Sequence, residues 1–169
     1  PLASTTPHNT ISFAAKGQEF KEAFMFVEGP CPYYSSFPDK KALGLFNSNL
    51  FTEIDHNYVN PTTDQHLSEI VKAFRNLNKW NKQKGYSSIP RTFNEYMTWS
   101  AFTLFAYDHF EEELFLQAKD IQEQIMIQSR GFVLYRQFNN KMLELYQNLE
   151  PGTTVADLYP DIIQWARSY

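Results

Sequence analysis

Proline divides this chain into two parts with different expected structures. Six of the nine prolines precede residue 62, and the other three stand at positions 90, 151 and 160. Because proline lacks a backbone N–H and interrupts the interior of regular elements, the proline-rich front favours loops and short strands. The sequence therefore predicts an α+β fold that is predominantly α-helical, with strands and loops over residues 1–47 and helices over residues 48–169.

Two short apolar runs in the front are the expected strands. Residues 11–15 and 23–27 are apolar and contain the β-favouring residues Ile, Phe and Val. The segment Glu28–Pro32, which follows the second run, has the composition of a turn. These runs predict a small β contribution at the N-terminal edge of the domain.

Two helices are expected before Pro90. The first spans residues 50–59 after a polar N-cap at residues 48–49, and it ends before Pro61 because the residue preceding a proline is disfavoured in the α region. The second follows a threonine cap at residues 62–63 and continues towards Gly85. Its expected apolar face consists of Leu67, Ile70, Val71, Phe74 and Leu77.

Residues 91–130 contain neither Gly nor Pro, which is too long a stretch for one ordinary helix in a domain of this size. A break is predicted near Asp108, because Asp108 and Glu111 have the spacing of a capping box. The stretch then divides into helices over residues 93–107 and 111–127.

Two further helices are expected after Gly131. The first has apolar residues every three or four positions as far as Leu149. The second opens at Thr154, with Asp157 as its capping partner and Pro160 in or near its first turn.

The composition limits the classes of function. A chain of 169 residues, 43% of them hydrophobic, can bury a core as one domain without disulfides, and its single cysteine, Cys31, could form none internally. A net charge of −4 with interspersed basic residues argues against nucleic acid as a partner, and no apolar run approaches the about 20 residues of a membrane span. The expected partner is a protein, a peptide or a small molecule.

Aromatic residues make up 17% of the chain, and most of them fall on the expected helix faces. They wrap around much of the helix over residues 93–107, which predicts a central helix packed on several sides. Tyr33 and Tyr34 differ, because they lie in a loop flanked by prolines.

The segment Thr52–His56 carries the most informative pattern. It has the frame of the zinc-peptidase motif H-E-x-x-H, with Thr52 in the first histidine position and with Glu53 and His56 retained. That motif needs a helix, because two ligands four residues apart then project from one face while the glutamate activates the bound water. Asn94-Glu95 follows 39 positions after His56, within an expected helix.

These residues resemble the gluzincin branch of the zincins, and in particular a group of uncharacterised, mostly exported bacterial proteins with a zincin-like domain. The resemblance covers roughly residues 45–169. Its matching positions are Glu53, His56, Tyr58, the Val59-Asn60-Pro61 exit, Asn94-Glu95 and the terminal Asp157-Leu158-Tyr159-Pro160.

The resemblance implies a zincin-like domain over residues 1–169, a fragment or reduced version of a peptidase, exported from a bacterium. It implies a zinc metallopeptidase whose metal ligands are His56 and Glu95, with Glu53 as catalytic base and with Tyr33 and Tyr34 lining a peptide-binding cleft. Thr52 departs from the pattern and leaves the zinc one ligand short, so the implied site is degenerate, and weak or inactive. His66 or His109 could complete it, although no spacing rule places them there.

Other interpretations of the same residues stay open. Glu53 and His56 can form a buried polar pair in a fold without metal, and Glu95 can be a helix-start carboxylate that complements the helix dipole. The alternative function is then a metal-free peptide-, glycan- or protein-binding or structural module of helical type. A third class is a helical interaction domain unrelated to peptidases.

Overall fold

The computed structural model describes residues 40–82 and 85–169, and this part of the chain is predominantly helical, as the sequence predicts. The described residues contain one isolated β-bridge, between Asn81 and Phe132, and no strand. The strands expected over residues 11–15 and 23–27 lie outside the described ranges. The elements are α2 (Lys40–Gln65), α3 (Leu67–Ala73), α4 (Leu77–Trp80), α5 (Ile89–His109), α6 (Glu112–Gln124), the π-helix η2 (Ile125–Ser129), α7 (Tyr135–Gln147), the 3-10 helix η3 (Val155–Leu158) and α8 (Tyr159–Ala166).

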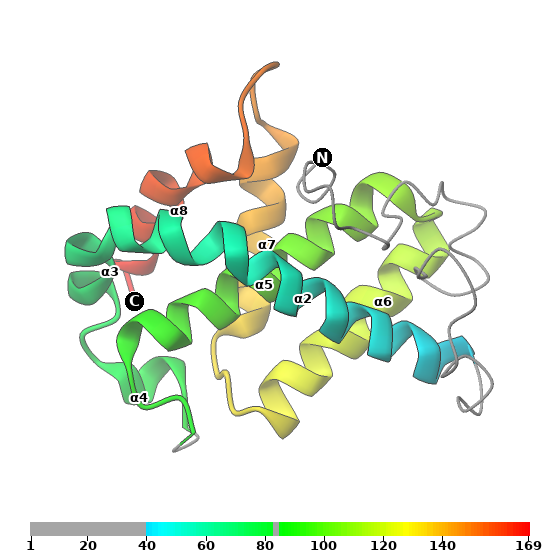
Figure 1. The fold of residues 1–169 in the computed structure, drawn as a ribbon, viewed down its shortest axis with the longest axis horizontal. Helices are drawn as coiled ribbons and strands as arrows, with labels where there is room; N and C mark the ends of the chain where they lie inside the picture. Colours follow the sequence, from blue (N-terminus) through cyan, green and yellow to red (C-terminus); the bar gives the residue numbers. More distant parts are fainter. Residues whose placement is uncertain (1–39, 83–84) are drawn as a thin grey trace.

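Helix α5 is the central element of the fold. It packs against α2, α3, α6 and α7, and α8 closes the arrangement by contacting both α7 and α3 (Figure 1). Residues on several sides of α5 are buried, including Phe93, Tyr96, Trp99 and Phe102, whereas Tyr107 near its end is 41% exposed. The prediction of a central aromatic helix is confirmed.

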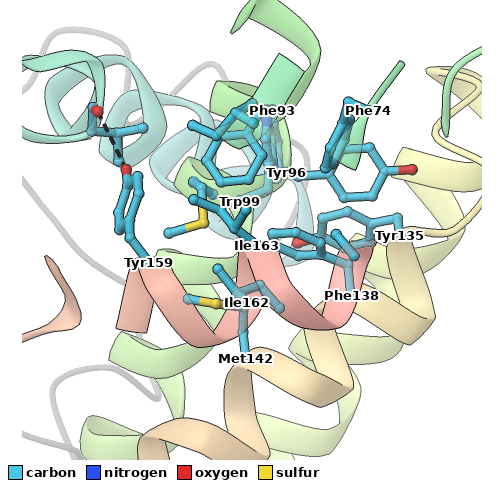
Figure 2. Packing of buried hydrophobic residues seen from close by; sticks show 14 of the residues in the cluster. Phe74, Phe93, Tyr96, Trp99, Tyr135, Phe138, Met142, Tyr159, Ile162 and Ile163 are labelled. Atoms are coloured by element: carbon cyan, nitrogen blue, oxygen red, sulfur yellow. Dashed lines mark hydrogen bonds between the residues drawn. The ribbon is translucent and has the colours of Figure 1, made fainter. Parts of the chain in front are cut away.

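Figure 2 shows the aromatic core between α5, α7 and α8. The Tyr96 ring lies 5.0 Å from Phe138 and 5.8 Å from Phe74 between centroids, and Phe74 stacks on Trp80 at 3.8 Å. Tyr159 at the start of α8 donates its hydroxyl to the Val59 carbonyl oxygen at 3.3 Å, the contact dashed in the figure. The core therefore ties the C-terminal helix directly to α2.

The helix expected over residues 50–59 has the wrong boundaries. It is part of α2, which begins at Lys40 and passes through Pro61 without ending. A proline inside a helix costs roughly 3 kcal/mol. Here the cost is offset by burial of Val59 and Thr63 on either side of the proline, and the Thr62 hydroxyl donates to the Tyr58 carbonyl oxygen at 3.0 Å.

The prediction of a single helix after residue 63 is also wrong, because this segment forms two short helices, α3 and α4. The chain turns after Ala73, which lets Trp80 fold back onto the Phe74 ring. As a result Ile70 and Phe74 are buried, while Val71, placed on the same expected face, is 42% exposed. The preference for stacking two large rings overrides the continuous helical pattern.

The later boundaries largely follow the prediction. The break between α5 and α6 lies where it was expected, but no capping box forms there, since the Asp108 carboxylate accepts a hydrogen bond from Tyr146 on α7 instead. The capping box at Thr154 is confirmed: the Thr154 amide donates to Asp157 Oδ2 at 2.7 Å. Pro160 stands in the first turn of α8, also as predicted.

Candidate functional site

The packing of α2 on α5 brings His56 and Glu95 together. His56 Nε2 lies 3.6 Å from Glu95 Oε1, although the two residues are 39 positions apart in the chain. Asn60 joins the same group, because its Oδ1 accepts from Asn94 Nδ2 at 2.6 Å and lies 3.3 Å from His56 Nδ1. The two segments that carry the zincin resemblance therefore meet at one place.

Arg130 occupies the other side of the Glu95 carboxylate. Its Nη1 donates to Glu95 Oε2 at 2.9 Å, and the Trp99 indole Nε1 donates to the same oxygen at 3.2 Å. The guanidinium carbon also lies 5.0 Å from the Trp99 ring centroid and 5.6 Å from that of Tyr86, which is the geometry of a cation–π contact. Glu95 is thus held by a cation and an indole as well as by His56.

Sequence reasoning missed Arg130, Trp99 and Tyr86 as parts of this site. Arg130 directly follows the π-helix η2 and is separated from Glu95 by 35 positions. No motif links arginine to a carboxylate over that distance. The one local indication in the sequence is Gly131, a residue typical of the position after a helix end. Its φ of 73° confirms that the helical segment ends just before it, at Arg130.

The site is half-buried. The side chains of His56, Glu95 and Arg130 are 23%, 14% and 28% exposed. The hydrogen bond with Glu95 raises the pKa of His56 above its ordinary value, burial opposes this shift, and the charges of Glu95 and Glu53 add to it. Protonated His56 is therefore favoured by its surroundings.

The remaining predicted site residues are placed differently. Thr52 is buried and Glu53 is exposed on the neighbouring turn of α2, close enough for its charge to act on His56. His66 stacks on the Tyr159 ring with centroids 5.4 Å apart, and His109 packs on Phe105 at 4.5 Å. Neither histidine joins the site. Tyr33, Tyr34 and Cys31 lie outside the described residues.

The described residues do not by themselves fit a catalytic zinc. Such a zinc takes three protein ligands and a water, and no group of three or more His, Cys, Asp or Glu within the described ranges is arranged to hold a metal ion. His56 and Glu95 supply two ligands at most, and Glu95 Oε2 already accepts hydrogen bonds from Arg130 and Trp99.

Comparison of the chain with protein-family models, with curated proteins and with solved structures finds no match. Within the described part of the chain, none of the helices combines the length and the apolarity needed to cross a membrane.

Proposed function

We propose that this domain is a metal-free peptide-binding module, in which the charged site formed by His56, Glu95 and Arg130 receives the carboxylate of a peptide. The observation that carries the proposal is the position of Arg130 against Glu95. A guanidinium 2.9 Å from the carboxylate supplies the positive charge that a zinc-dependent site would take from its metal.

Arg130 has the chemistry to hold such a ligand. An arginine carries five N–H donors in a planar fork that matches a carboxylate, and the described residues engage only the Nη1 end of this one. The contacts with Tyr86 and Trp99 fix the plane of the guanidinium, and its 28% exposed side chain leaves part of it open to solvent. Protonated His56 adds a second positive charge at the opposite oxygen of the same Glu95 carboxylate.

The indole N–H of Trp99 reports directly on this site, because it donates to the same Glu95 oxygen as Arg130. The probe is acetyl-tetra-alanine with a free carboxyl terminus, titrated into uniformly ¹⁵N-labelled protein, with the corresponding carboxamide as the matched control. We expect the free acid to shift the Trp99 indole signal saturably and the carboxamide to shift it much less. The indoles of Trp80 and Trp165 serve as internal references, since the chain has three tryptophans.

Arg130→Lys is the variant that tests the role of the fork. Lysine keeps the positive charge but loses the planar donors and the stacking, so we expect binding of the free acid to weaken by about tenfold or more. The exposed Arg91 provides the control variant, Arg91→Lys, which should bind as the wild type does. Equal shifts with free acid and carboxamide, or unchanged binding in Arg130→Lys, would contradict the proposal.

The second candidate is the zinc metallopeptidase-like domain that the resemblance implies. The convergence of His56 and Glu95 from separate helices favours it. Its test is zinc analysis of the full chain purified without chelators, for which it requires about one zinc per chain. A companion variant, Thr52→His with Arg130→Gln, restores the first motif position and frees Glu95, and zinc titration calorimetry should detect binding if only that ligand is missing. An empty wild type together with a folded, non-binding variant would exclude this candidate.

A further inference from the structure

A second face of α2, away from His56, lines a recess that is separate from the charged site of His56, Glu95 and Arg130. The recess has a volume of about 50 Å³ and opens to solvent. Its wall combines residues of α2 and α5 with residues of η3 and the adjoining start of α8, so three segments distant in sequence meet there. Asp55 and Tyr58, one helical turn apart on α2, are its acidic and phenolic members.

Both of these residues present a buried polar atom without a partner. Asp55 is only 4% exposed, and neither its Oδ2 nor the Tyr58 hydroxyl has a hydrogen-bond partner in the described part of the chain. A buried polar group left unsatisfied costs free energy, and native proteins pair the great majority of such groups. Two unsatisfied oxygens lining one recess indicate that a donor from outside the described residues belongs there.

The rest of the wall is mostly apolar and carries no cation. Val59, Met97 and Val155 supply methyl and methylene groups, and no Lys, Arg or His of the described ranges lines the recess. The Tyr159 hydroxyl, although it belongs to the wall, is already engaged by the Val59 carbonyl oxygen and by Thr63. The titratable groups around Asp55 are therefore His56 and Tyr58 on its own helix and Tyr159 on α8.

We infer that this recess binds a primary alkylammonium group, with the Asp55 carboxylate as its counter-ion, the Tyr58 hydroxyl as a second acceptor and the apolar wall around its methylene stem. An ammonium is a compact donor of three N–H bonds and a full positive charge, so it satisfies both oxygens and offsets the desolvation of the carboxylate. Water is small enough to enter, but it brings no positive charge to pair with the carboxylate of Asp55 when that group is ionised. A divalent cation needs six or more oxygen ligands or several waters, and the wall offers one carboxylate.

The same chemistry has two sources, a free small amine and a lysine side chain of a peptide or protein. Ethylammonium chloride represents the first, and Nα-acetyl-lysine N-methylamide represents the second. Each is titrated into the full chain while methyl signals of Val59, Met97 and Val155 and the side-chain carboxyl ¹³C signal of Asp55 are followed by NMR. Sodium chloride at equal ionic strength, 1-propanol as a neutral analogue and tetramethylammonium, which has no N–H donor, are the controls.

We expect saturable shifts at these methyls and at the Asp55 carboxyl with one or both amines, and none with the three controls. A tighter response to the lysine derivative identifies a lysine side chain as the ligand, and a response to ethylammonium alone identifies a free amine. Asp55→Asn should abolish the response or weaken it by about tenfold or more, and Tyr58→Phe should weaken it less. Both substitutions preserve shape, and a far-UV and thermal-unfolding measurement verifies that each variant is folded.

Two results would overturn the inference. One is the lack of a saturable response to either amine in the folded wild type, which would mean that the recess holds only water. The other is an equal response in wild type and folded Asp55→Asn, which would place amine binding elsewhere on the chain.

Discussion

The Tyr96 hydroxyl donates a hydrogen bond to the Trp80 carbonyl oxygen at 2.7 Å. The same hydroxyl accepts a hydrogen bond from the Leu134 amide at 3.2 Å, so one phenol on α5 connects the end of α4 with the residue before α7. Those segments also meet through the Val133 amide, which donates to the Trp80 carbonyl oxygen at 2.9 Å. Tyr96 therefore holds the loop that follows η2 in place beside the end of α4.

Tyr96→Phe should reduce the free energy of unfolding by about 1–3 kcal/mol, because it removes a buried hydroxyl and leaves the Leu134 amide without this acceptor. Chemical denaturation of both proteins measures the difference. Tyr107→Phe is the matched control on the same helix: Tyr107 is 41% exposed, so its change should stay within about 0.5 kcal/mol. Equal effects of the two substitutions would show that the Tyr96 contacts contribute nothing.

The pKa of His56 should lie above its ordinary value of 6.5, chiefly because the hydrogen bond to Glu95 favours the protonated imidazole. Glu95→Gln removes the carboxylate charge and should lower this pKa, as measured by proton NMR of the imidazole. His109 is the internal reference, because burial lowers its pKa and it does not contact Glu95. A His56 that titrates at the same pH in both proteins would rule out the contact.

The same shift makes stability depend on pH. The folded pKa of His56 is raised above 6.5, so its contribution to stability is fully present below pH 6.5 and is lost as pH rises through the folded pKa. Urea titrations of wild type and Glu95→Gln between about pH 5 and 9 should show this loss in the wild type and a smaller one in the variant. Parallel profiles would contradict the expectation.

Glu123 should be the most sensitive carboxylate in the described part of α6. Its side chain is 4% exposed and accepts hydrogen bonds from Lys119 at 2.5 Å, Arg136 at 2.7 Å and Asn139 at 3.2 Å. Glu123→Gln should lower the free energy of unfolding by about 2–4 kcal/mol, because the buried side chain at this position loses its charge-assisted hydrogen bonds to Lys119 and Arg136.

A neighbouring carboxylate on the same helix provides the comparison. Asp120 lies 3.8 Å from Arg136 and its side chain is 59% exposed. Asp120→Asn should therefore change stability by less than about 1 kcal/mol. If Glu123→Gln is no more destabilising than Asp120→Asn, the buried network is not a source of stability.

Asp55 should make the folded state less stable as pH rises. Burial raises its pKa from 3.8 to about 7, with the charge of His56 opposing the shift. Because the folded state then binds the proton more tightly than the unfolded state does, stability falls as pH increases from about 4 to about 7. Asp55→Asn should lack this decline, so its stability relative to the wild type should increase over that interval, as followed by urea denaturation without added amine. A constant difference would mean that Asp55 titrates normally.

Sequence patterns predicted those helix boundaries that are determined by neighbouring side chains. The Thr154 capping box and the helix expected as far as Leu149, which ends at Gln147, follow from nearby side chains; the break after α5 lies where it was expected, although its capping box does not form. The errors came where tertiary packing decides: Pro61 stays within α2 because its flanks are buried, and the turn after Ala73 serves the stacking of Phe74 on Trp80.

The candidate site divides in the same way. A motif comparison was enough to single out His56 and Glu95, which lie 3.6 Å apart. Arg130 could not be predicted, because its pairing with Glu95 depends on where η2 places the following residue relative to α5. The Asp55 recess was equally hidden, since α5, η3 and α8 complete a wall that no segment of the sequence forms alone.

The π-helical turn η2, immediately before Arg130, determines where the charged site can tolerate a change in chain length. Each residue of an α-helix advances the direction of its side chain by about 100°, and a π-turn accommodates one residue more than an α-turn does. Deleting a single residue from Ile125–Ser129 would convert the π-turn into an α-turn and leave Arg130 facing Glu95, whereas deleting one from the regular α6 would turn Arg130 by about 100°. A one-residue deletion in this five-residue turn should therefore preserve the charged site, and the same deletion in the α-helical turns before it should separate Arg130 from Glu95.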